Sequence, residues 1–383
     1  EAIRQVKKAV GRNDCLYIHV TLVPFVTGAG ELKTKPTQHS VKELRSLGIQ
    51  PDILICRSAK PIPQDMCEKM AMFCDVDADA VFQNLTARSI YEVPVLLEKQ
   101  GLDEVVLRKL DVDATDHPLD MAEWHDMVER MLKDYDRKVT LGVVGKYVEL
   151  QDSYISLTEA LRHAAMANEA NLDIKWINAE LVEEGEIDLE AELKDVDCIL
   201  VPGGFGSKGL EGKISAIKYA RENKVPFFGI CLGMQCAVVE YARHIGMTGA
   251  NTTEANAETA YPVIDILPDQ QDVEEKGSMR LGLYPCKVAA GSLTEKAYGE
   301  ALIYERHRNR YEVNNAYREE LEKNGLVIAG ALPNGRLVEI VELPTDVHPW
   351  FMGVQFHPEL KSRPTNPHPL FRDFIAAALK EQK

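Results

Sequence analysis

One sequence feature restricts the fold of this chain most. It is an apolar strand that ends in a Gly-x-Cys-x-Gly turn and is followed by a helix. The run Pro226-Phe-Phe-Gly-Ile-Cys-Leu-Gly-Met-Gln-Cys236 has this pattern, the thiol counterpart of the nucleophile elbow of Gly-x-Ser-x-Gly sequences. A side chain on such a strained turn needs neighbours without a Cβ, and the flanking glycines meet that need. The following helix start favours a thiolate, and the Leu232 N–H can point at an oxyanion. Cys231 is therefore the candidate nucleophile, although a buried cysteine between two incidental glycines has the same pattern.

The segment Trp350-Phe-Met-Gly-Val-Gln-Phe-His-Pro-Glu359 supplies a base for this thiol. It reads as a buried strand that ends in His-Pro-Glu, and residues i and i+2 of an extended segment point to the same side. We therefore expect Glu359 to orient the His357 imidazole while the other ring nitrogen faces Cys231. A surface turn is the alternative for His-Pro-Glu taken alone. The sequence has no His-Glu-x-x-His or Cys-x-x-Cys pattern, so we expect no metal site in this chain.

A glycine-rich loop follows another apolar strand in Asp197-Cys-Ile-Leu-Val-Pro-Gly-Gly-Phe-Gly-Ser207. Gly203 and Gly204 allow backbone N–H groups to approach a ligand closely, which suits the second half of an oxyanion hole. A phosphate loop or an ordinary turn is the alternative. The loop lacks the Gly-Lys-Ser/Thr ending of a P-loop, so phosphate is the poorer interpretation.

From Lys138 to its C-terminus, the chain resembles class I glutamine amidotransferase domains, most closely those of CTP synthases. The family motifs Pro-Gly-Gly-Phe-Gly, Gly-Ile-Cys-Leu-Gly-Met-Gln and Gln-Phe-His-Pro-Glu are present in that order. A fourth segment, Glu305-Arg-His-Arg-Asn-Arg-Tyr-Glu-Val-Asn-Asn315, is more particular to CTP synthases. The resemblance implies a catalytic triad of Cys231, His357 and Glu359. It also implies that glutamine is bound by Gly204, Leu232, Gly233, Met234, Gln235, Glu254 and Arg310.

Two of these residues also make chemical sense as a pair. Free glutamine presents an α-amino group and an α-carboxylate, so one carboxylate and one guanidinium can fix both ends. Glu254 and Arg310 carry the required charges. The alternative for Arg310 is a solvated face, because residues 306–310 form a basic run.

The N-terminal third contains a local basic cluster in Lys33-Thr-Lys-Pro-Thr-Gln-His-Ser-Val-Lys-Glu-Leu44. Two lysines and two hydroxyls precede an apparent helix, with Thr37 or Ser40 as its cap, and such helix starts attract phosphate. The chain has a net charge of −16, so it should repel nucleic acid and we expect none as a partner. A solvated lysine pair is the alternative. The resemblance implies UTP and CTP contacts at Lys33, Thr34, Lys35, Pro36, Thr37, Gln38 and Lys69, and an ATP contact at Ala87.

The sequence opens on a helical pattern, with Ile3, Val6 and Val10 on one face. CTP synthases carry an ATP-binding glycine-rich loop, its lysine and the magnesium carboxylates before this point, and those motifs are missing here. We expect that the chain retains the glutaminase half alone and makes no CTP. ATP and magnesium would be substrates of the full-length enzyme, GTP its allosteric activator and CTP its feedback inhibitor.

The predicted fold class is α/β, with two domains that are each a mostly parallel sheet flanked by helices. A length of 383 residues with 45% apolar content suffices for two such cores. We assign residues 1–112 to the C-terminal part of a synthetase domain, 113–137 to a linker with an amphipathic segment at Met121–Leu132, and 138–383 to the amidotransferase domain. We expect a lid loop at Asp269–Gly277, near the GTP site. The resemblance implies a homotetramer when the protein is full length.

Eight cysteines without a disulfide framework, and no targeting segment, favour the cytoplasm. No apolar run approaches the roughly 18 to 20 residues that span a membrane. Three other functions stay open on the sequence: a freestanding thiol hydrolase of γ-glutamyl peptides, an amidotransferase of GMP or anthranilate synthase type, and an inert nucleotide-binding assembly module. The first two do not explain the segments 33–38 and 305–315, and the third does not explain the intact triad.

Overall fold

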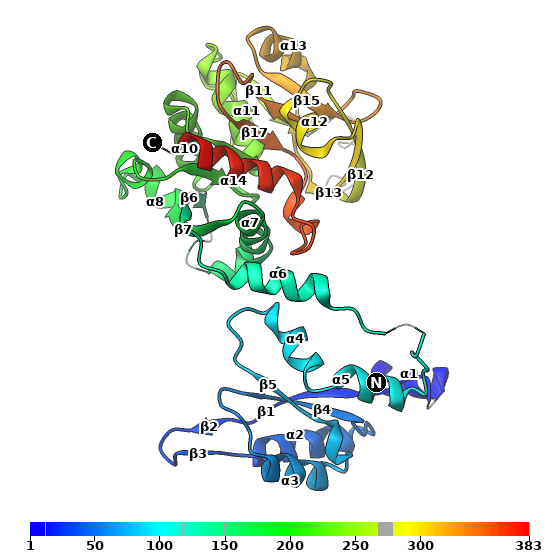
Figure 1. Cartoon of the computed structure of the whole chain (residues 1–383). Helices are drawn as coiled ribbons and strands as arrows, with labels where there is room; N and C mark the ends of the chain where they lie inside the picture. The colour runs from blue at the N-terminus through cyan, green and yellow to red at the C-terminus, as the bar shows by residue number, and fades with distance from the viewer. Residues whose placement is uncertain (12, 117, 147, 149, 267–278, 383) are drawn as a thin grey trace. The chain divides into compact units, whose positions relative to one another are not determined.

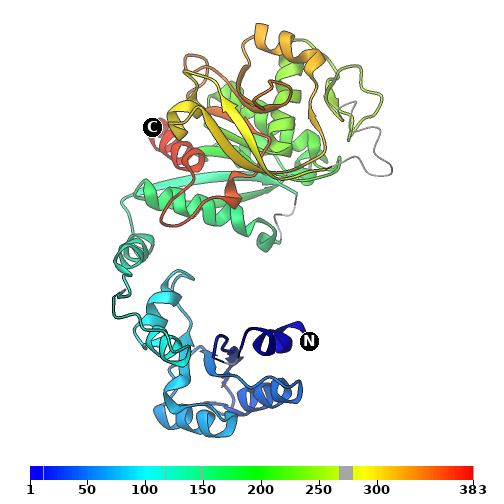
Figure 2. The ribbon, with the colours of Figure 1, turned by 90° about the vertical axis from the view of Figure 1, so that its right-hand side faces the viewer.

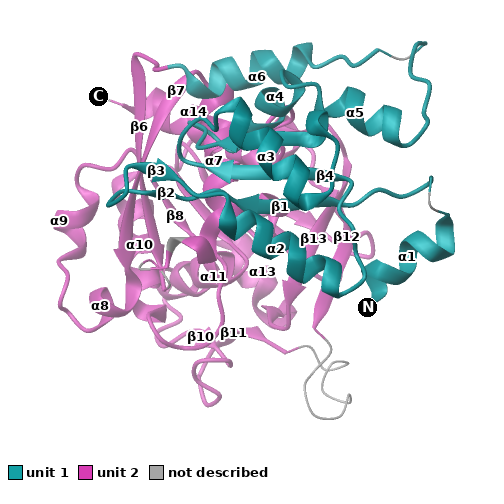
Figure 3. Cartoon of the chain, turned by 90° about the horizontal axis from the view of Figure 1, so that it is seen from below, with its two compact units in different colours: residues 1–133 teal, residues 134–383 magenta. Residues whose placement is uncertain are grey.

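The computed structural model describes residues 1–11, 13–116, 118–146, 148, 150–266 and 279–382. The chain divides into two compact units, residues 1–133 (unit 1) and residues 134–383 (unit 2), coloured separately in Figure 3. The boundaries proposed from the sequence, 112 and 138, lie on either side of this division. The expected lid loop at Asp269–Gly277 lies outside the described residues.

Unit 1 is built on a parallel sheet in the order β1-β4-β5. Its strands are β1 (Ile18–Leu22), β4 (Ile53–Ser58) and β5 (Val81–Leu85), with a short hairpin of β2 (Phe25–Val26) and β3 (Glu31–Leu32). Its helices are α1 (Ala2–Val10), α2 (Lys35–Ser46), α3 (Gln64–Cys74), η1 (Ala78–Ala80), α4 (Glu92–Glu98), α5 (Leu102–Lys109) and α6 (Ala122–Leu132). Buried apolar side chains of β4 face both ways, Leu54 toward Val41 and Met70, and Ile53 toward Phe82 and Val105. The small sheet is therefore covered on both faces.

Helix α2 begins at Lys35 with Thr34 as its N-cap, so the prediction of a cap at Thr37 or Ser40 is wrong. Pro36 lies in the first turn, where its fixed φ and missing N–H are tolerated. Thr37 is fully buried inside the helix, and its hydroxyl donates to the carbonyl of Leu22 at 3.0 Å. This contact fixes α2 against β1.

The predicted amphipathic segment forms α6, which packs on α4 within unit 1. The indole N–H of Trp124 donates to the carbonyl of Tyr91 at 2.9 Å. Nε2 of His125 lies 2.7 Å from Oε2 of Glu98. Helix α6, which lies within the segment that the sequence assigned to a linker, therefore belongs to unit 1.

Unit 2 contains a nine-stranded sheet in the order β13-β12-β15-β16-β17-β9-β8-β6-β7. Figure 1 labels strands from both of its ends, β13 and β12 at one and β6 and β7 at the other. The pairings from β17 to β7 are parallel, whereas those from β13 to β17 are antiparallel. The α/β class is confirmed, but the parallel order holds for one half of this sheet. The nine strands are β6 (Arg137–Gly145), β7 (Ala170–Asn178), β8 (Cys198–Val201), β9 (Phe227–Ile230), β12 (Arg280–Val288), β13 (Leu302–Asn309), β15 (Val327–Ala331), β16 (Val338–Glu342) and β17 (Phe351–Val354).

Helices cover both faces of this sheet, as Figure 2 shows. One face carries α10 (Leu210–Asn223), α11 (Leu232–His244) and α13 (Asn315–Lys323), and the other carries α7 (Ile155–Ala167), α12 (Leu293–Tyr298) and α14 (Pro369–Glu381). The remaining elements are η2 (Gln151–Tyr154), α8 (Ala179–Glu183), α9 (Leu189–Leu193), η4 (Pro358–Leu360) and a small sheet of β10 (Asn251–Thr252), β11 (Pro262–Asp265) and β14 (Glu312–Val313). Within the described ranges, no helix combines the length and apolar content needed to cross a membrane.

The central strands of unit 2 bring three segments to one edge of the sheet. Phe228 on β9 is fully buried, with the rings of Phe371 and Trp350 at centroid distances of 5.3 Å and 5.5 Å. This packing holds the strand on its core side. In the register, Val201 of β8 lies opposite Gly229, and Ile230 lies opposite Val354 of β17. The carboxyl ends of β8, β9 and β17 therefore meet, as is typical of sites in parallel sheets.

Candidate active site

Cys231 lies between β9 and α11 in a conformation that few non-glycine residues adopt, with φ 52° and ψ −105°. Its N–H donates to the carbonyl of Val354 at 2.7 Å, which ties the turn to β17. A Cβ at Gly229 would stand 2.7 Å from the carbonyl carbon of Gly233, and a Cβ at Gly233 would stand 2.0 Å from the carbonyl oxygen of Val201. Both glycines are therefore required for the helix to approach the strands.

His357 is oriented by Glu359, as the sequence predicts. Nδ1 of the imidazole lies 2.8 Å from Oε1 of the carboxylate. The prediction that the segment is extended is wrong, because Pro358–Leu360 forms a 3₁₀ turn in which the Leu360 N–H donates to the His357 carbonyl. The fixed φ of proline suits the start of such a turn. The turn replaces the extended backbone and still brings the two side chains together.

Cys231 and His357 meet at Gly203. A Cβ at residue 203 would lie 2.8 Å from Cε1 of His357 and 3.4 Å from Cβ of Cys231. Nε2 of His357 is buried and makes no hydrogen bond within the described ranges of the chain. The glycine-rich loop therefore leaves room for the imidazole beside the sulfur. Nε2 of the ring is available for a hydrogen bond to a ligand.

The charge state of His357 follows from its neighbours. Burial lowers the pKa of His357, but the Cys231 sulfur and the Glu359 carboxylate raise it by more, so that it reaches about 10. The imidazole is thus protonated at neutral pH beside the Cys231 sulfur. A protonated histidine beside the nucleophile can deliver a proton to a leaving group.

Backbone N–H groups border the same space. A Cβ at Gly204 would touch Cδ2 of Leu232 at 3.4 Å, so the glycine-rich loop lies against the first residue of α11. The N–H groups of a first helical turn have no partner within the helix. The N–H groups of Gly204 and Leu232 are therefore candidates for the two halves of an oxyanion hole.

The two charged residues expected to bind glutamine both lie near Tyr311. Oε1 of Glu254 accepts the Gly206 N–H at 3.0 Å, which places the carboxylate beside the glycine-rich loop. Burial raises the pKa of the Tyr311 phenol, Glu254 raises it further and Arg310 lowers it. Both charges are therefore close enough to affect the same hydroxyl. Nε of Arg310 is buried without a hydrogen-bond partner among the residues that the structure describes.

The first turn of α11 contributes less side-chain chemistry than the resemblance implies. Met234 is fully buried, and a Cβ at Gly353 would lie 3.0 Å from its Cγ, so its side chain packs on β17. The Gln235 amide is also committed, because Nε2 donates to the carbonyl of Tyr311 at 3.0 Å and to Oε1 of Gln355 at 3.1 Å. Contacts from Leu232 to Gln235 would therefore come mainly from the backbone.

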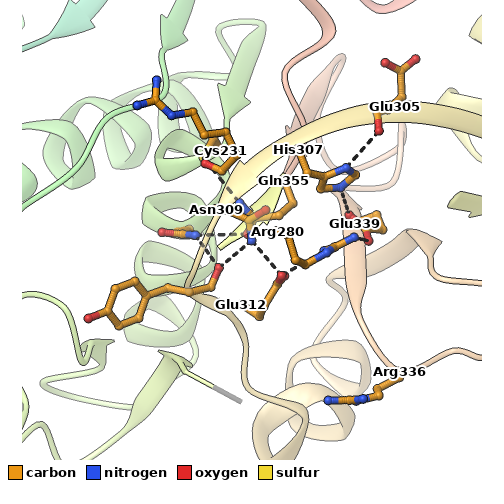
Figure 4. A network of polar contacts seen from close by, with 12 residues as sticks. Cys231, Arg280, Glu305, His307, Asn309, Glu312, Arg336, Glu339 and Gln355 are labelled. Atoms are coloured by element: carbon orange, nitrogen blue, oxygen red, sulfur yellow. Dashed lines mark hydrogen bonds and ion pairs between the residues drawn. The ribbon is translucent and has the colours of Figure 1, made fainter. Parts of the chain in front are cut away.

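The sequence interpretation assigned no role to Gln355. The side chain is fully buried, and its Nε2 donates to Sγ of Cys231 at 3.6 Å (Figure 4). A signal was available in the sequence, because a glutamine between Val354 and Phe356 interrupts a buried apolar strand. A polar group buried in such a place needs a hydrogen-bond partner.

A cluster of buried charges lies behind the site, on β12, β13, β14 and β16 (Figure 4). Arg280 donates from Nη1 to Glu312 at 2.9 Å and from Nη2 to Glu339 at 2.6 Å. Nε2 of His307 lies 2.6 Å from the other oxygen of Glu339. Burial raises the pKa of Glu312, while Arg280 opposes that rise.

The basic run at 306–310 is only partly a solvated face. Arg306 and Arg308 are exposed on β13, whereas His307 between them is buried. Arg310, after the strand, is partly buried. Because alternate side chains of a strand point to opposite faces, Arg306 and Arg308 lie at the surface and His307 lies in the interior.

The residues expected to contact nucleotides lie in unit 1. Lys33 forms an ion pair with Glu31, and Lys35 and Pro36 are exposed at the start of α2. Thr34 and Thr37 are buried, and Gln38 donates to the Thr34 hydroxyl. Lys69 is exposed on α3, which packs beside α2, and Ala87 follows β5.

Comparisons with known proteins cover both units. The family model "Glutamine amidotransferase class-I" matches residues 149–377, and "CTP synthase N-terminus" matches residues 1–112. A CTP synthase from Clostridium kluyveri is 57% identical over 384 residues, covering 100% of this chain and 70% of the relative. One from Pelotomaculum thermopropionicum is 58% identical over 382 residues, covering 99% and 70%. The solved glutaminase domain of Trypanosoma brucei CTPS with bound acivicin is 38% identical, with a TM-score of 0.59, covering 64% of this chain and 95% of that domain.

Proposed function

The chain belongs to the CTP synthase family, and we propose that Cys231, His357 and Glu359 hydrolyse glutamine to supply ammonia for the amination of UTP to CTP. One observation carries the proposal. A cysteine in a strained turn at a helix start lies against the same glycine as a histidine whose other side is held by a carboxylate. Nucleophile, base and orienting group are thus arranged as covalent acyl transfer requires.

In the first step the Cys231 thiolate attacks the carbon of the glutamine side-chain amide. A bond forms between Sγ and that carbon, and the carbonyl π electrons move to oxygen. The N–H groups of Gly204 and Leu232 are the donors for this oxyanion. The positive end of the α11 helix dipole also stabilises its negative charge.

In the second step His357 gives its Nε2 proton to the amide nitrogen, so that ammonia leaves as the C–N bond breaks. A thioester to Cys231 remains. Neutral His357 then takes a proton from water as the water oxygen bonds to the thioester carbon. The C–S bond breaks, which releases glutamate and returns the Cys231 thiolate. Glu359 stabilises the imidazolium and holds the ring orientation throughout.

Selectivity for a free amino acid follows from Glu254 and Arg310. The carboxylate would accept from the α-ammonium group, and the guanidinium would donate to the α-carboxylate. Nε of Arg310, which has no hydrogen-bond partner among the described residues, is a buried donor suited to such a ligand. A peptide-bound glutamine lacks one or both charges and would leave these groups unpaired.

The nucleotide half of the reaction is proposed from family membership, with Lys33, Lys35 and Lys69 near UTP or CTP and Ala87 near ATP. GTP activation, CTP feedback inhibition and a homotetramer belong to the same proposal. Within the described residues, no group of three His, Cys, Asp or Glu side chains is arranged to hold a metal ion. The glutaminase steps above use no metal ion.

The testing experiment incubates the polypeptide with glutamine, UTP, ATP and magnesium, with and without GTP, and measures glutamate and CTP together. We expect the wild type to release glutamate and C231A to release none. An equal rate in C231A would reject the triad, and no glutamate from the folded wild type would favour an inert module. Release from γ-glutamyl peptides in preference to glutamine would favour the freestanding hydrolase.

A further inference from the structure

We propose that Gln355 is a further catalytic residue, whose carboxamide donates a hydrogen bond to Sγ of Cys231 and stabilises the thiolate. The inference rests on the proposed role of Cys231 as the nucleophile. Gln355 is fully buried on the segment between β17 and His357, and its Nε2 lies 3.6 Å from the sulfur. The contact joins the segment that leads to the base with the turn that carries the nucleophile.

The direction of this hydrogen bond is set by a relay of two carboxamides, those of Gln235 and Gln355. The carbonyl oxygen of Tyr311 can only accept, so the Gln235 group that lies 3.0 Å from it must be the NH₂. The same NH₂ lies 3.1 Å from Gln355, which must therefore present its oxygen there. The NH₂ of Gln355 is then left to face Cys231. The Tyr311 carbonyl thus fixes the orientation of both amides, and the NH₂ of Gln355 faces the sulfur.

The acceptor that starts the relay is itself fixed. Nδ2 of Asn309 donates to the Tyr311 carbonyl at 3.1 Å and to Oε1 of Glu312 at 2.7 Å. Glu312 is held in turn by Arg280. The buried charge cluster therefore anchors the relay and keeps Gln355 from rotating its amide.

The donor from Gln355 matters most after the thiol loses its proton. Sγ of Cys231 also lies 3.9 Å from the carbonyl oxygen of Arg308, which can accept from a thiol but offers nothing to a thiolate. Hydrogen bonds to an ionised acceptor are stronger than those to a neutral one. Gln355 therefore favours the charged form of the nucleophile, together with His357.

The test is the rate of Cys231 alkylation by iodoacetamide between pH 4 and 10, followed by mass spectrometry of the peptide that contains residue 231. In Q355M, which removes the donor, we expect the midpoint of the pH profile to rise by about one unit and kcat at pH 7 to fall about tenfold. The limiting alkylation rate at high pH should not fall, because a less stabilised thiolate is at least as nucleophilic.

Val354→Ala is the matched control, because it removes apolar volume from the adjacent core position. It should lower the unfolding temperature and leave the alkylation midpoint unchanged. Q235M keeps Gln355 but releases its amide, so the midpoint should rise by less than in Q355M. Q355E should raise it at least as far as Q355M, because a carboxylate repels the thiolate.

A folded Q355M with the wild-type midpoint would overturn the inference. If Q355M does not fold, an unchanged midpoint in Q235M would overturn it by the same criterion. Glutamate release is measured separately on the wild type. If the wild type releases no glutamate and the alkylation midpoint still rises in Q355M, the proposed glutaminase function is rejected and the hydrogen bond from Gln355 is retained.

Discussion

Gly203 lies directly against the imidazole of His357, since a Cβ at residue 203 would stand 2.8 Å from Cε1. Side chains essentially never show a Cβ this close to another heavy atom. The same Cβ would lie 3.4 Å from Cβ of Cys231. The glycine therefore sets the position of the base relative to the nucleophile.

The variant G203A should displace the imidazole and lower glutamine hydrolysis by about 100-fold, since displacements near 1 Å have effects of this size. Overpacking should cost about 1–3 kcal/mol of unfolding free energy. The measurement is kcat with the melting temperature of the same sample. Gly28→Ala is the control, because a Cβ there meets nothing within 4 Å. Wild-type turnover in G203A would show that His357 is not the group that this glycine accommodates.

Loss of either charge at the glutamine site should weaken substrate binding. E254Q and R310M each remove one charge-assisted contact, so the KM for glutamine should rise about tenfold to 100-fold. R306M is the matched control, since Arg306 is an exposed arginine on the preceding strand, β13. E254Q should also discriminate less against analogues without the α-amino group. If KM stays at the wild-type value in both variants, the two residues do not bind the substrate ends.

His348 should make unit 2 sensitive to acid. Its Nε2 donates to the Ala220 carbonyl, and its Nδ1 accepts the Trp350 N–H, so a second proton has no acceptor. Burial lowers the pKa of His348 to about 4, and nearby Lys224 and Arg221 lower it as well.

The direction of the pH dependence of stability follows from proton binding. The unfolded state binds the extra proton at about pH 6.5 and the folded state only near pH 4, so stability is full above 6.5 and falls on acidification. The loss should reach about 3 kcal/mol by pH 4. Urea unfolding followed by tryptophan fluorescence at pH 7 and pH 4.5 should show a smaller difference in H348Q than in the wild type. Equal differences in the two proteins would contradict this account.

Glu339 should matter for stability more than any surface carboxylate of comparable geometry. It is fully buried between Arg280 and His307, both at 2.6 Å. E339Q removes one of the two carboxylates that pair with the buried Arg280, which should cost about 3–5 kcal/mol of unfolding free energy. D173N, which breaks an exposed pair with Lys138, should cost no more than about 1 kcal/mol. Similar urea midpoints for the two variants would mean that the cluster is dispensable.

Local patterns were sufficient for part of the site. The strand, the turn at Cys231 and the following helix were predictable, because a buried apolar run, flanking glycines and a helix start are all local signals. The same holds for Glu359 beside His357, since a two-residue spacing limits how far apart the side chains can lie. The 3₁₀ turn that joins them was not predicted, because proline permits both backbones and tertiary contacts select one.

The sequence by itself determined the α/β class and the candidate nucleophile, since these depend on residue type and short spacing, whereas the assignment of Glu254 and Arg310 to the substrate came from the resemblance to a family. Only the tertiary structure decided that Gln355 donates to Cys231, and that Arg280 lies between Glu312 and Glu339. These contacts join segments 32 to 124 residues apart. They depend on strand order and register, including the antiparallel half of the sheet, which no local propensity encodes.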